Sequence, residues 1–350
     1  MTCRPTPHGV VPPIILEHIA RTAESAEDRE SALNSLAIDH TLRMQRVTAT
    51  ERGQFGLAPG AVDEVNRSIY TAGGTEDLPG TLVRAEGQPA SGDVAVDEAY
   101  DGLGATYALF QDVYGRESID DEGLALLATV HFGERYDNAF WNGSQMVFGD
   151  GDGVIFNRFT ISLDVIGHEL THGVTEDEAG LIYLNQPGAL NESVSDVFGS
   201  LVKQYARNQP ADQADWLIGE GLFTPSVNGV ALRSMKAPGT AYDDPRIGKD
   251  PQPAHMDDYV HTTRDNGGVH INSGIPNRAF YLAATAFGGN AWEKAGRIWY
   301  DALRDPRLRP TARFRTFARA TVRAATALGS DEAAVVVDAW RGVGVDIDVR

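Results

Sequence analysis

The stretch His168-Glu169-Leu170-Thr171-His172 decides how this chain is expected to fold. Apolar residues recur around it with helical spacing, at Leu163, Ile166, Leu170 and Val174. This period predicts an amphipathic helix, on which the two imidazoles share one face about one turn apart, within reach of a single zinc ion. The motif is short, so two ordinary histidines on such a helix are the alternative at this point.

A second helical pattern follows and carries Glu192, twenty residues after His172. Two antiparallel helices joined by a turn would bring Glu192 opposite the histidines. The result would be a site of two histidines and one glutamate, with a fourth position free for water. Asn191 and Asp196 would then hold the imidazoles through hydrogen bonds. The alternative for Glu192 and Asp196 is an exposed carboxylate pair near a helix start.

Changes of periodicity divide the rest of the chain. Residues 16–44 have a helical pattern, and 47–60 read as a polar, glycine-bearing linker. Glycine turns and short alternating stretches follow up to about 160, with a helical insert from Asp97 to Tyr114, and the pattern is helical thereafter. We predict an α+β protein with a helical leader (1–50), a β-rich lobe (51–162) and a mainly helical lobe (163–350).

Composition narrows the class of protein. The 350 residues carry 30 basic and 49 acidic side chains, a net charge of −19 without a basic patch, which disfavours nucleic acid and membrane surfaces as partners. Cys3 is the single cysteine, so no intramolecular disulfide forms. No apolar run approaches membrane-spanning length, and the start is too proline-broken for a signal peptide. We expect a monomer made in the cytoplasm, or exported by a route without an ordinary signal peptide.

Three further motifs follow one another in a familiar order: Asn138-Ala139-Phe140-Trp141, Gly149-Asp150-Gly151-Asp152-Gly153, and the stretch 265–274, DNGGVHINSG. With the two helices, they make the chain similar to the thermolysin-like zinc metalloproteases, from about residue 60 to the end. The leader resembles the protealysin branch through Val11-Pro12-Pro13-Ile14-Ile15-Leu16. The resemblance implies a two-lobed zincin and the precursor of a zinc-dependent endopeptidase.

The resemblance also implies catalytic roles. Glu169 would be the general base, taking a proton from water and passing it to the leaving amine. His270, oriented by Asp265, and Tyr183 would donate hydrogen bonds to the developing oxyanion. Without the resemblance, His270 would be read as an ordinary core histidine.

The same resemblance assigns substrate contacts. Asn138 and Ala139 would bond the backbone of a bound peptide, and Arg233 one of its carbonyl groups. A pocket would be lined by Phe156, Phe159, Val165 and Leu232, and would favour a bulky apolar residue just after the cut bond. Phe159 replaces a smaller aliphatic residue of the family, so we expect a shallower pocket that prefers Leu or Ile over Phe.

Calcium is where the sequence departs most from the family. Asp164, Asp215 and Glu220 match acidic ligands of a paired calcium site, but Lys203 and Leu217 replace two others. Two ions are therefore not expected. One calcium ion and an ion-free patch neutralised by Lys203 remain as alternatives. Val230 replaces an aspartate of another calcium loop, and we expect that site to be absent.

The leader is expected to act as an intramolecular inhibitor, with the rigid strand Val11-Pro12-Pro13-Ile14 lying in the substrate groove. Self-processing is expected near residues 46–57, where Arg46–Val47, Gln54–Phe55 and Gly56–Leu57 each place an apolar residue after a bond. Cys3 has two interpretations, an incidental terminal residue or a thiolate that caps the zinc.

A second class of function is a zinc-binding scaffold that is catalytically silent and stays capped by its leader. The presence of Glu169, Tyr183, Asp265 and His270 together argues against it, since a silent protein has no chemical use for the whole set. Hydrolysis of a protein substrate with and without a chelator distinguishes the two classes.

Overall fold

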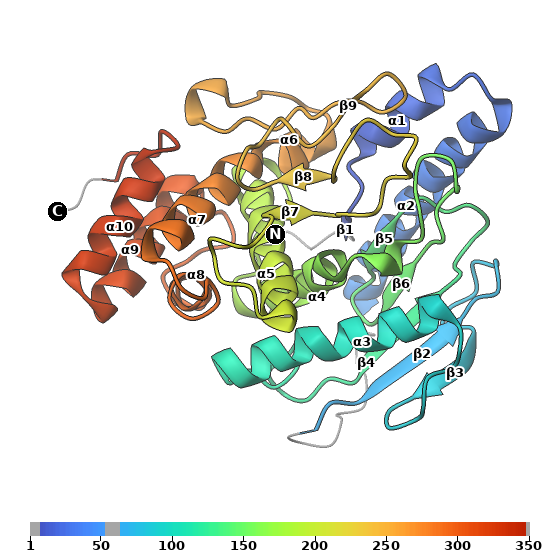
Figure 1. Ribbon diagram of the computed structural model, residues 1–350, viewed down its shortest axis with the longest axis horizontal. Coiled ribbons are helices and arrows are strands. Elements are labelled where there is room, and N and C mark those ends of the chain that lie inside the picture. Colours follow the sequence, from blue (N-terminus) through green and yellow to red (C-terminus); the bar gives the residue numbers. More distant parts are fainter. Residues whose placement is uncertain (1–7, 53–63, 348–350) are drawn as a thin grey trace.

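A six-stranded mixed sheet lies at one side of the molecule (Figure 1). The computed structural model describes residues 8–52 and 64–347, without the side chains of 44–52. Across the sheet, the strands are β1 (His8–Gly9), β5 (Ala139–Trp141), β6 (Met146–Phe148), β4 (Leu126–Val130), β2 (Arg67–Thr71) and β3 (Thr81–Ala85). β4 pairs in parallel with β2 and β6, and the other pairs are antiparallel. The amino-terminal segment thus supplies an edge strand of this sheet.

The predicted helical insert lies against the sheet as α3 (Val94–Ala108), continued by a π-helical turn, η1 (Leu109–Tyr114). It begins three residues before the predicted start, because the Asp93 carboxylate accepts hydrogen bonds from the backbone N–H groups of Ala95 and Val96 and caps the helix there. Gly102 of α3 faces Ile166, where a Cβ would stand only 2.3 Å from the isoleucine Cδ1. α3 therefore joins the sheet to the helical half of the molecule.

Two long antiparallel helices, α4 (Leu163–Glu178) and α5 (Asn185–Arg207), run through the centre. Most of their residues are buried. A Cβ at Gly199 would lie 2.3 Å from the carbonyl oxygen of Asp164, so only glycine permits the observed approach. This close contact sets the facing residues of the two helices opposite one another.

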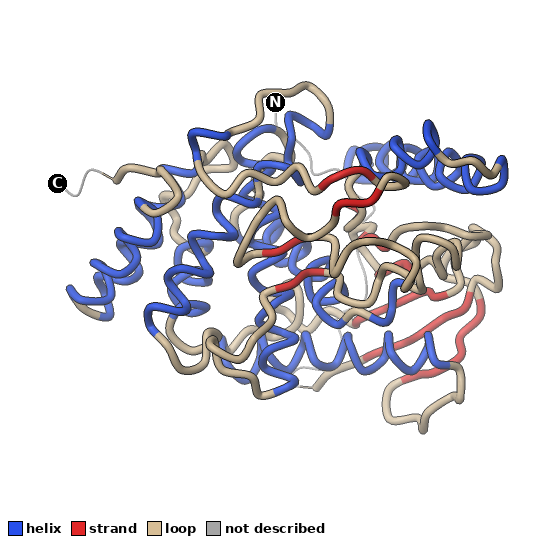
Figure 2. The backbone as a smooth tube through the Cα atoms, turned by 45° about the horizontal axis from the view of Figure 1, so that its top comes forward, coloured by secondary structure: helices blue, strands red, loops and turns tan. Residues whose placement is uncertain are grey.

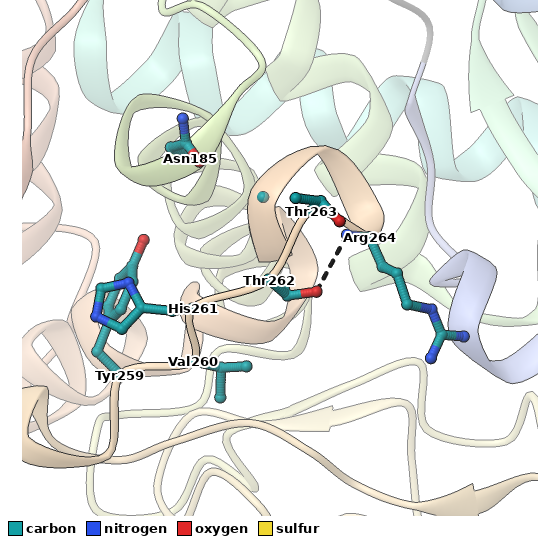
Figure 3. A pocket seen from close by; sticks show the side chains of 8 residues that line it. Asn185, Tyr259, Val260, His261, Thr262, Thr263 and Arg264 are labelled. Atoms are coloured by element: carbon teal, nitrogen blue, oxygen red, sulfur yellow. Dashed lines mark hydrogen bonds between the residues drawn. The ribbon is translucent and has the colours of Figure 1, made fainter.

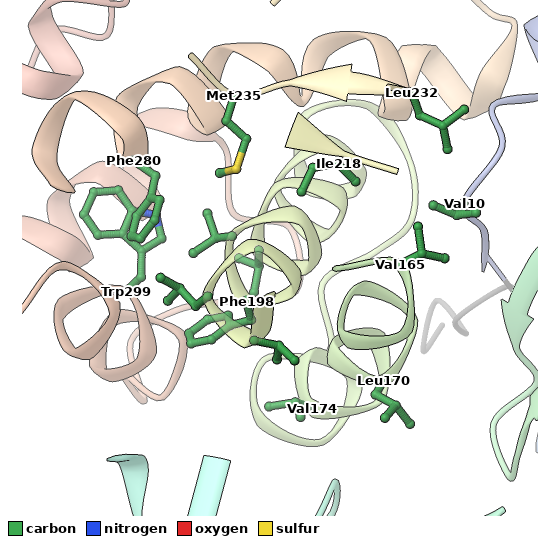
Figure 4. Packing of buried hydrophobic residues seen from close by; sticks show 14 of the residues in the cluster. Val10, Val165, Leu170, Val174, Phe198, Ile218, Leu232, Met235, Phe280 and Trp299 are labelled. Atoms are coloured by element: carbon green, nitrogen blue, oxygen red, sulfur yellow. The ribbon is translucent and has the colours of Figure 1, made fainter. Parts of the chain in front are cut away.

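The carboxyl-terminal helices pack on the other side of α5, away from the sheet (Figure 2). They are α6 (Asp265–Asn272), α7 (Gly274–Phe287), α8 (Ala295–Leu303), α9 (Phe314–Leu328) and α10 (Ser330–Arg341). Figure 4 shows Phe198 of α5 facing Phe280 and Trp299 across this core, and the rings of Phe280 and Trp299 meet edge to face at 5.0 Å. None of the helices in the described ranges has the length and apolar content needed to cross a membrane.

Short elements complete the helical half. They are the two-stranded sheets β7 (Leu217–Ile218) with β8 (Arg233–Ser234) and β9 (Asp243–Asp244) with β10 (Gly248–Lys249), and the 3-10 turns η2 (Phe159–Ile161) and η3 (Met256–Asp258). The prediction of an α+β architecture, with strands in the first part of the chain and helices in the second, is confirmed.

The leader consists of β1 and two helices, α1 (Pro13–Thr22) and α2 (Ala26–Arg52). Two sequence predictions were wrong here. Pro13 and Ile14 belong to α1 rather than to a strand, because proline fits the first turn of a helix. The linker predicted from Val47 begins later, since α2 continues to Arg52. The first glycine of the predicted linker is Gly53, directly after this helix. Residues 53–60 of that linker lie outside the described residues, as does Cys3.

A buried ammonium group ties α4 and α5 to β7. Lys203 Nζ lies 2.7 Å from Asp164 Oδ2 and 2.8 Å from Asp215 Oδ1, and it donates to the Leu217 carbonyl at 2.8 Å. Burial opposes the charge, but the two carboxylates outweigh it and raise the pKa of Lys203. The Lys203 side chain is 2 % exposed, so this cation is part of the interior.

The three predicted calcium ligands are not brought together. Asp164 and Asp215 close on Lys203, whereas Glu220 is about half exposed and faces Arg207 at 3.7 Å. An ammonium thus occupies the position between the two aspartates. Of the two alternatives, this arrangement favours the ion-free one, and Val230 is an exposed residue.

Replacing Lys203 with Met should lower the free energy of unfolding by about 3 kcal/mol, because it leaves the Asp164 carboxylate buried without a counter-charge. Chemical denaturation of the two proteins measures the difference. Lys236, an exposed lysine, is the matched control, and its replacement with Met should change stability by less than about 0.5 kcal/mol. A Lys203→Met protein as stable as the unsubstituted chain would contradict the assignment.

Candidate active site

The two imidazoles of α4 face each other across one helical turn. His168 Nδ1 donates to Asp196 Oδ1 at 2.8 Å, and His172 Nδ1 donates to Asn191 Oδ1 at 2.8 Å. These acceptors fix the proton on each Nδ1, so each Nε2 carries the lone pair of its ring. The two Nε2 atoms lie 3.1 Å apart, and both side chains are buried. Asn191 and Asp196 therefore hold the imidazoles as the sequence predicts.

Glu192 of α5 completes the cluster. Its carboxylate oxygens lie 3.5 Å from the Nε2 atoms of His168 and His172. Glu192 is fully buried, and its Oε2 has no hydrogen-bond partner among the residues that the structure describes. A buried carboxylate with one oxygen unpaired, beside two imidazole lone pairs, is the donor set that a divalent cation such as zinc takes in proteins.

Glu169 points to the same place from the next position of α4. It offers a carboxylate oxygen within 4.8 Å of the ligand atoms of both imidazoles. Its Oε2 accepts the N–H of Trp141 at 3.0 Å, and its Oε1 has no hydrogen-bond partner within the described ranges. Burial, and then the neighbouring Glu192 carboxylate, raise the pKa of Glu169 well above its ordinary value. The side chain is thus suited to holding a proton in this site.

His270 and Tyr183 lie on the far side of Glu192. The hydroxyl of Tyr183 donates to Glu192 and stands 3.2 Å from His270 Nε2. Asp265 holds the ring from behind, with Oδ1 2.6 Å from His270 Nδ1 and Oδ2 accepting the His270 backbone N–H at 2.8 Å. A left-handed turn makes this possible, since φ is positive at Asp265, Asn266, Gly267 and Gly268. Burial opposes the charge on His270, but Glu192 and Asp265 outweigh it and raise the pKa of the imidazole.

The leader fills the cleft in front of this cluster. The backbone of β1 pairs antiparallel with β5, and the Val10 N–H donates to the Ala139 carbonyl at 3.1 Å. His270 Nε2 lies 3.2 Å from the Gly9 carbonyl oxygen. The Val11 N–H donates to Asn138 Oδ1 at 3.0 Å. The leader is therefore bound through backbone groups, as an extended peptide would be.

Arg233 contacts the next carbonyl of the leader, donating to Val10 O at 3.0 Å. Its other nitrogens bind Asp196, with Nε to Oδ2 at 2.9 Å and Nη2 to Oδ1 at 2.8 Å. Burial opposes ionisation of Asp196, but Arg233 and then His168 outweigh it and hold the pKa of this carboxyl below its usual range. One carboxylate thus orients both an imidazole of the cluster and the arginine that contacts the leader.

Val10 of the leader lies against part of the predicted apolar lining. Figure 4 shows the side chain of Val10 close to Val165 and Leu232, which come from different elements. Phe156 and Phe159 belong to the same buried cluster, and their ring centroids lie 5.6 Å apart. All five side chains are almost fully buried.

Several residues of the site were not predicted from the sequence. Asp39 of the leader accepts hydrogen bonds from the Tyr136 hydroxyl at 2.5 Å and from Asn138 Nδ2 at 2.9 Å. Asn277 of α7 donates to Asp196 Oδ2 at 2.8 Å. Asp39 lies among other polar residues of α2 and Asn277 is followed by Arg278, so the sequence offers no signal that singles out either residue.

A polar cavity of about 600 Å³ lies beside the cluster rather than in it. Figure 3 shows its lining of Asn185, Tyr259, Val260, His261, Thr262, Thr263 and Arg264. Arg264 donates to the carboxylate of Glu17 in α1, so the leader also contacts the rim of this cavity.

Comparison with known proteins agrees with this geometry. Residues 36–176 match the catalytic domain of the thermolysin metallopeptidases, and residues 179–345 match their alpha-helical domain. An extracellular metalloprotease of Pectobacterium carotovorum subsp. carotovorum is 56% identical over 346 residues, 97% of this chain and 96% of that protein. Protease PrtS of a Photorhabdus species is 51% identical over 343 residues, 97% of this chain and 92% of that protein.

A solved structure gives the same result. The precursor of protealysin, a metalloproteinase from Serratia proteamaculans, superposes with a TM-score of 0.89 at 57% sequence identity, covering 97% of this chain and 99% of that one. With both domains matched and relatives similar over nearly their whole length, the chain belongs to the thermolysin family of metallopeptidases.

Proposed function

We propose that this chain is the latent precursor of a zinc endopeptidase that cuts peptide bonds on the amino-terminal side of bulky apolar residues. The observation that carries the proposal is the register of the leader. The Gly9 carbonyl faces His270, the Val10 carbonyl faces Arg233, and the Val10 side chain lies close to Val165 and Leu232. The Gly9–Val10 bond therefore lies where the scissile bond of a substrate would lie.

His168, His172 and Glu192 would hold the zinc ion. Zinc in this site would supply the Lewis-acid chemistry that makes water a nucleophile near neutral pH. Glu169 would take the proton of that water and pass it to the leaving amine, a role that fits a carboxyl with a raised pKa. His270 and Tyr183 would donate hydrogen bonds to the carbonyl oxygen as negative charge develops on it.

The remaining residues would position the peptide. Arg233 would bind the carbonyl that follows the cut bond, and Asn138 and Ala139 would bond the backbone as they bond the leader. A pocket lined by Phe156, Phe159, Val165 and Leu232 would select a branched aliphatic side chain, with Leu or Ile preferred over Phe. A catalytically silent scaffold is the weaker interpretation, since the relatives matched over most of the chain are named as proteases.

The leader (1–50) would keep the two lobes (51–162 and 163–350) latent by occupying the cleft. Of the predicted processing bonds, Arg46–Val47 lies inside α2, where a helical backbone resists binding in extended form. Gln54–Phe55 and Gly56–Leu57 lie outside the described residues. Because the cleft is filled by its own leader, cutting in this region requires a second enzyme molecule or a leader that has already left.

Replacing Glu169 with Gln should abolish casein hydrolysis, at least about 1,000-fold, because it removes the proton acceptor while keeping the shape of the side chain. The full-length protein should also keep its leader. Activity on casein, with and without a zinc chelator, and the mass of the protein measure both effects. In the unsubstituted enzyme, sequencing of the cut sites should show Leu or Ile after most bonds.

A Glu169→Gln protein that still cuts casein, or a chelator without effect, would contradict the proposed mechanism. If the variant is inactive but loses its leader when purified alone, the processing depends on another protease. Frequent cutting before Phe would contradict the pocket assignment alone.

Replacing Gly9 with Ala should release the leader early. A Cβ at this position would lie 2.3 Å from Asn138 Nδ2, and Asp39 prevents that amide from moving away. We expect the lag, the time between purification and the appearance of peptidase activity, to be about ten times shorter. The matched control is Glu30→Ala, at an exposed position of α2, which should leave the lag unchanged. Equal lags in the two variants would contradict the role of Gly9.

The lag before activity should shorten as pH rises. Asp39 is buried between Tyr136 and Asn138. Burial raises its pKa above the ordinary value, although the hydrogen bonds from these two residues and the charges of Arg43 and His270 oppose the shift. The docked leader therefore binds a proton more tightly than the free leader. Docking is favoured at low pH, and this stabilisation is lost as pH rises through the raised pKa.

The measurement is the lag after incubation at a series of pH values, followed by assay at one common pH. The Asp39→Asn side chain does not titrate. Its amide oxygen accepts from Asn138 Nδ2 while its NH2 group donates to the Tyr136 hydroxyl oxygen, so its lag should be long and independent of pH. Glu30→Gln is the control and should follow the unsubstituted chain. An Asp39→Asn profile that matches the unsubstituted chain would contradict the prediction.

A further inference from the structure

The carboxylate of Asp196 is the point at which the metal cluster and the peptide-binding arginine meet. Its Oδ1 accepts from His168 Nδ1 and Arg233 Nη2, both at 2.8 Å. Its Oδ2 accepts from Arg233 Nε at 2.9 Å and from Asn277 Nδ2 at 2.8 Å. A carboxylate held on both oxygens cannot rotate, so the directions of its two functional neighbours are fixed together.

Asn277 enters this network from a separate element. It stands in the first turn of α7, where its backbone N–H donates to the Ser273 carbonyl at 3.0 Å. The start of α7 is packed tightly, since a Cβ at Gly274 would lie 2.7 Å from the Pro253 carbonyl oxygen. The side chain of Asn277 is fully buried. Its amide is therefore delivered to Asp196 from a rigid support.

The other half of the Asn277 amide is unsatisfied. Its Oδ1 has no hydrogen-bond partner among the residues described by the structure, and the donation to Asp196 fixes which end of the amide is nitrogen. A buried carbonyl oxygen without a donor is destabilising, and an apolar side chain of the same shape would avoid that cost. The unpaired oxygen therefore offsets part of the stabilisation that the Nδ2–H bond to the Asp196 carboxylate provides, so the amide contributes less to stability than its buried position suggests.

We propose that Asn277 is a positioning residue that fixes the Asp196 carboxylate, and through it both the zinc-ligand direction of His168 and the carbonyl contact of Arg233. This inference rests on the proposed function of the site. It makes the affinity for zinc and the binding of the peptide depend on one amide, which contacts neither of them.

The test compares the full-length Asn277→Leu protein with the unsubstituted chain. Leu matches the shape of Asn but donates no hydrogen bond. Competition with a chromophoric chelator should show zinc bound about 10- to 100-fold more weakly, the usual effect of losing a group that supports a metal ligand. After leader removal, KM should rise and kcat should fall. The melting temperature of the metal-free protein should change little, because the lost bond to Asp196 and the removed unpaired carbonyl oppose each other and Arg233 Nε still donates to Asp196 Oδ2.

Thr285→Val is the matched control, another change of a polar to an apolar side chain in α7. Thr285 Oγ1 donates only within its own helix, to the Tyr281 carbonyl at 2.8 Å and more weakly to Leu282. Its zinc affinity and kinetics should equal those of the unsubstituted chain. Asn277→Ala serves as a second variant in case Leu is not accommodated, with the same expected loss of zinc affinity.

Zinc affinity and kinetics within twofold of the unsubstituted protein would overturn the inference. So would a melting temperature that falls in parallel with zinc affinity, since that pattern marks a structural role. If the unsubstituted chain itself fails to bind zinc, the proposed function is wrong and the inference falls with it. If the unsubstituted chain binds zinc, the Asn277→Leu protein binds it more weakly as expected, and neither protein has peptidase activity, only the proposed function is overturned.

Discussion

The close approach of α4 and α5 is the constraint on which the rest of the structure depends. Gly199 lets the two helices approach closely enough for the buried side chains of His168 and His172 to face Glu192. Three groups that prefer water are thereby placed together without hydrogen bonds to one another. Such an arrangement is costly unless a cation is bound, so helix packing and metal binding are linked in one equilibrium.

Hydrogen bonds around the cluster hold its side chains in place. Each imidazole uses its second nitrogen to bond a side chain of α5, and the carboxylate of Asp196 is shared with Arg233. The ligands are therefore held in place before any ion arrives, and the group that contacts the peptide is built on the same support. Preorganisation of this kind lowers the entropy that binding would otherwise lose.

Much of this site could be predicted from the sequence, because it depends on local spacing. The four-residue interval of the histidines and the helical period around Glu192 are visible without a structure. The succession of several motifs along the chain indicated the thermolysin family. Contacts between distant segments could not be predicted in the same way. Ser31, Ser35 and Asp39 are spaced by four along α2, yet only the folded chain shows that they bond the loop at Tyr136, Asp137 and Asn138. Polar residues on a charged helix are otherwise expected to face solvent. The end of α2 was misplaced because its last turn lacks glycine and proline.

Lys203 has a consequence for how the protein responds to its surroundings. A cation that belongs to the chain is supplied at synthesis and cannot be lost by dilution, whereas a bound calcium ion is present only where the medium provides it. The junction of α4, α5 and β7 is thus cross-linked regardless of the local ion concentration. Because Lys203 Nζ lies between Asp164 and Asp215, withdrawal of metal ions by a chelator would leave this contact in place.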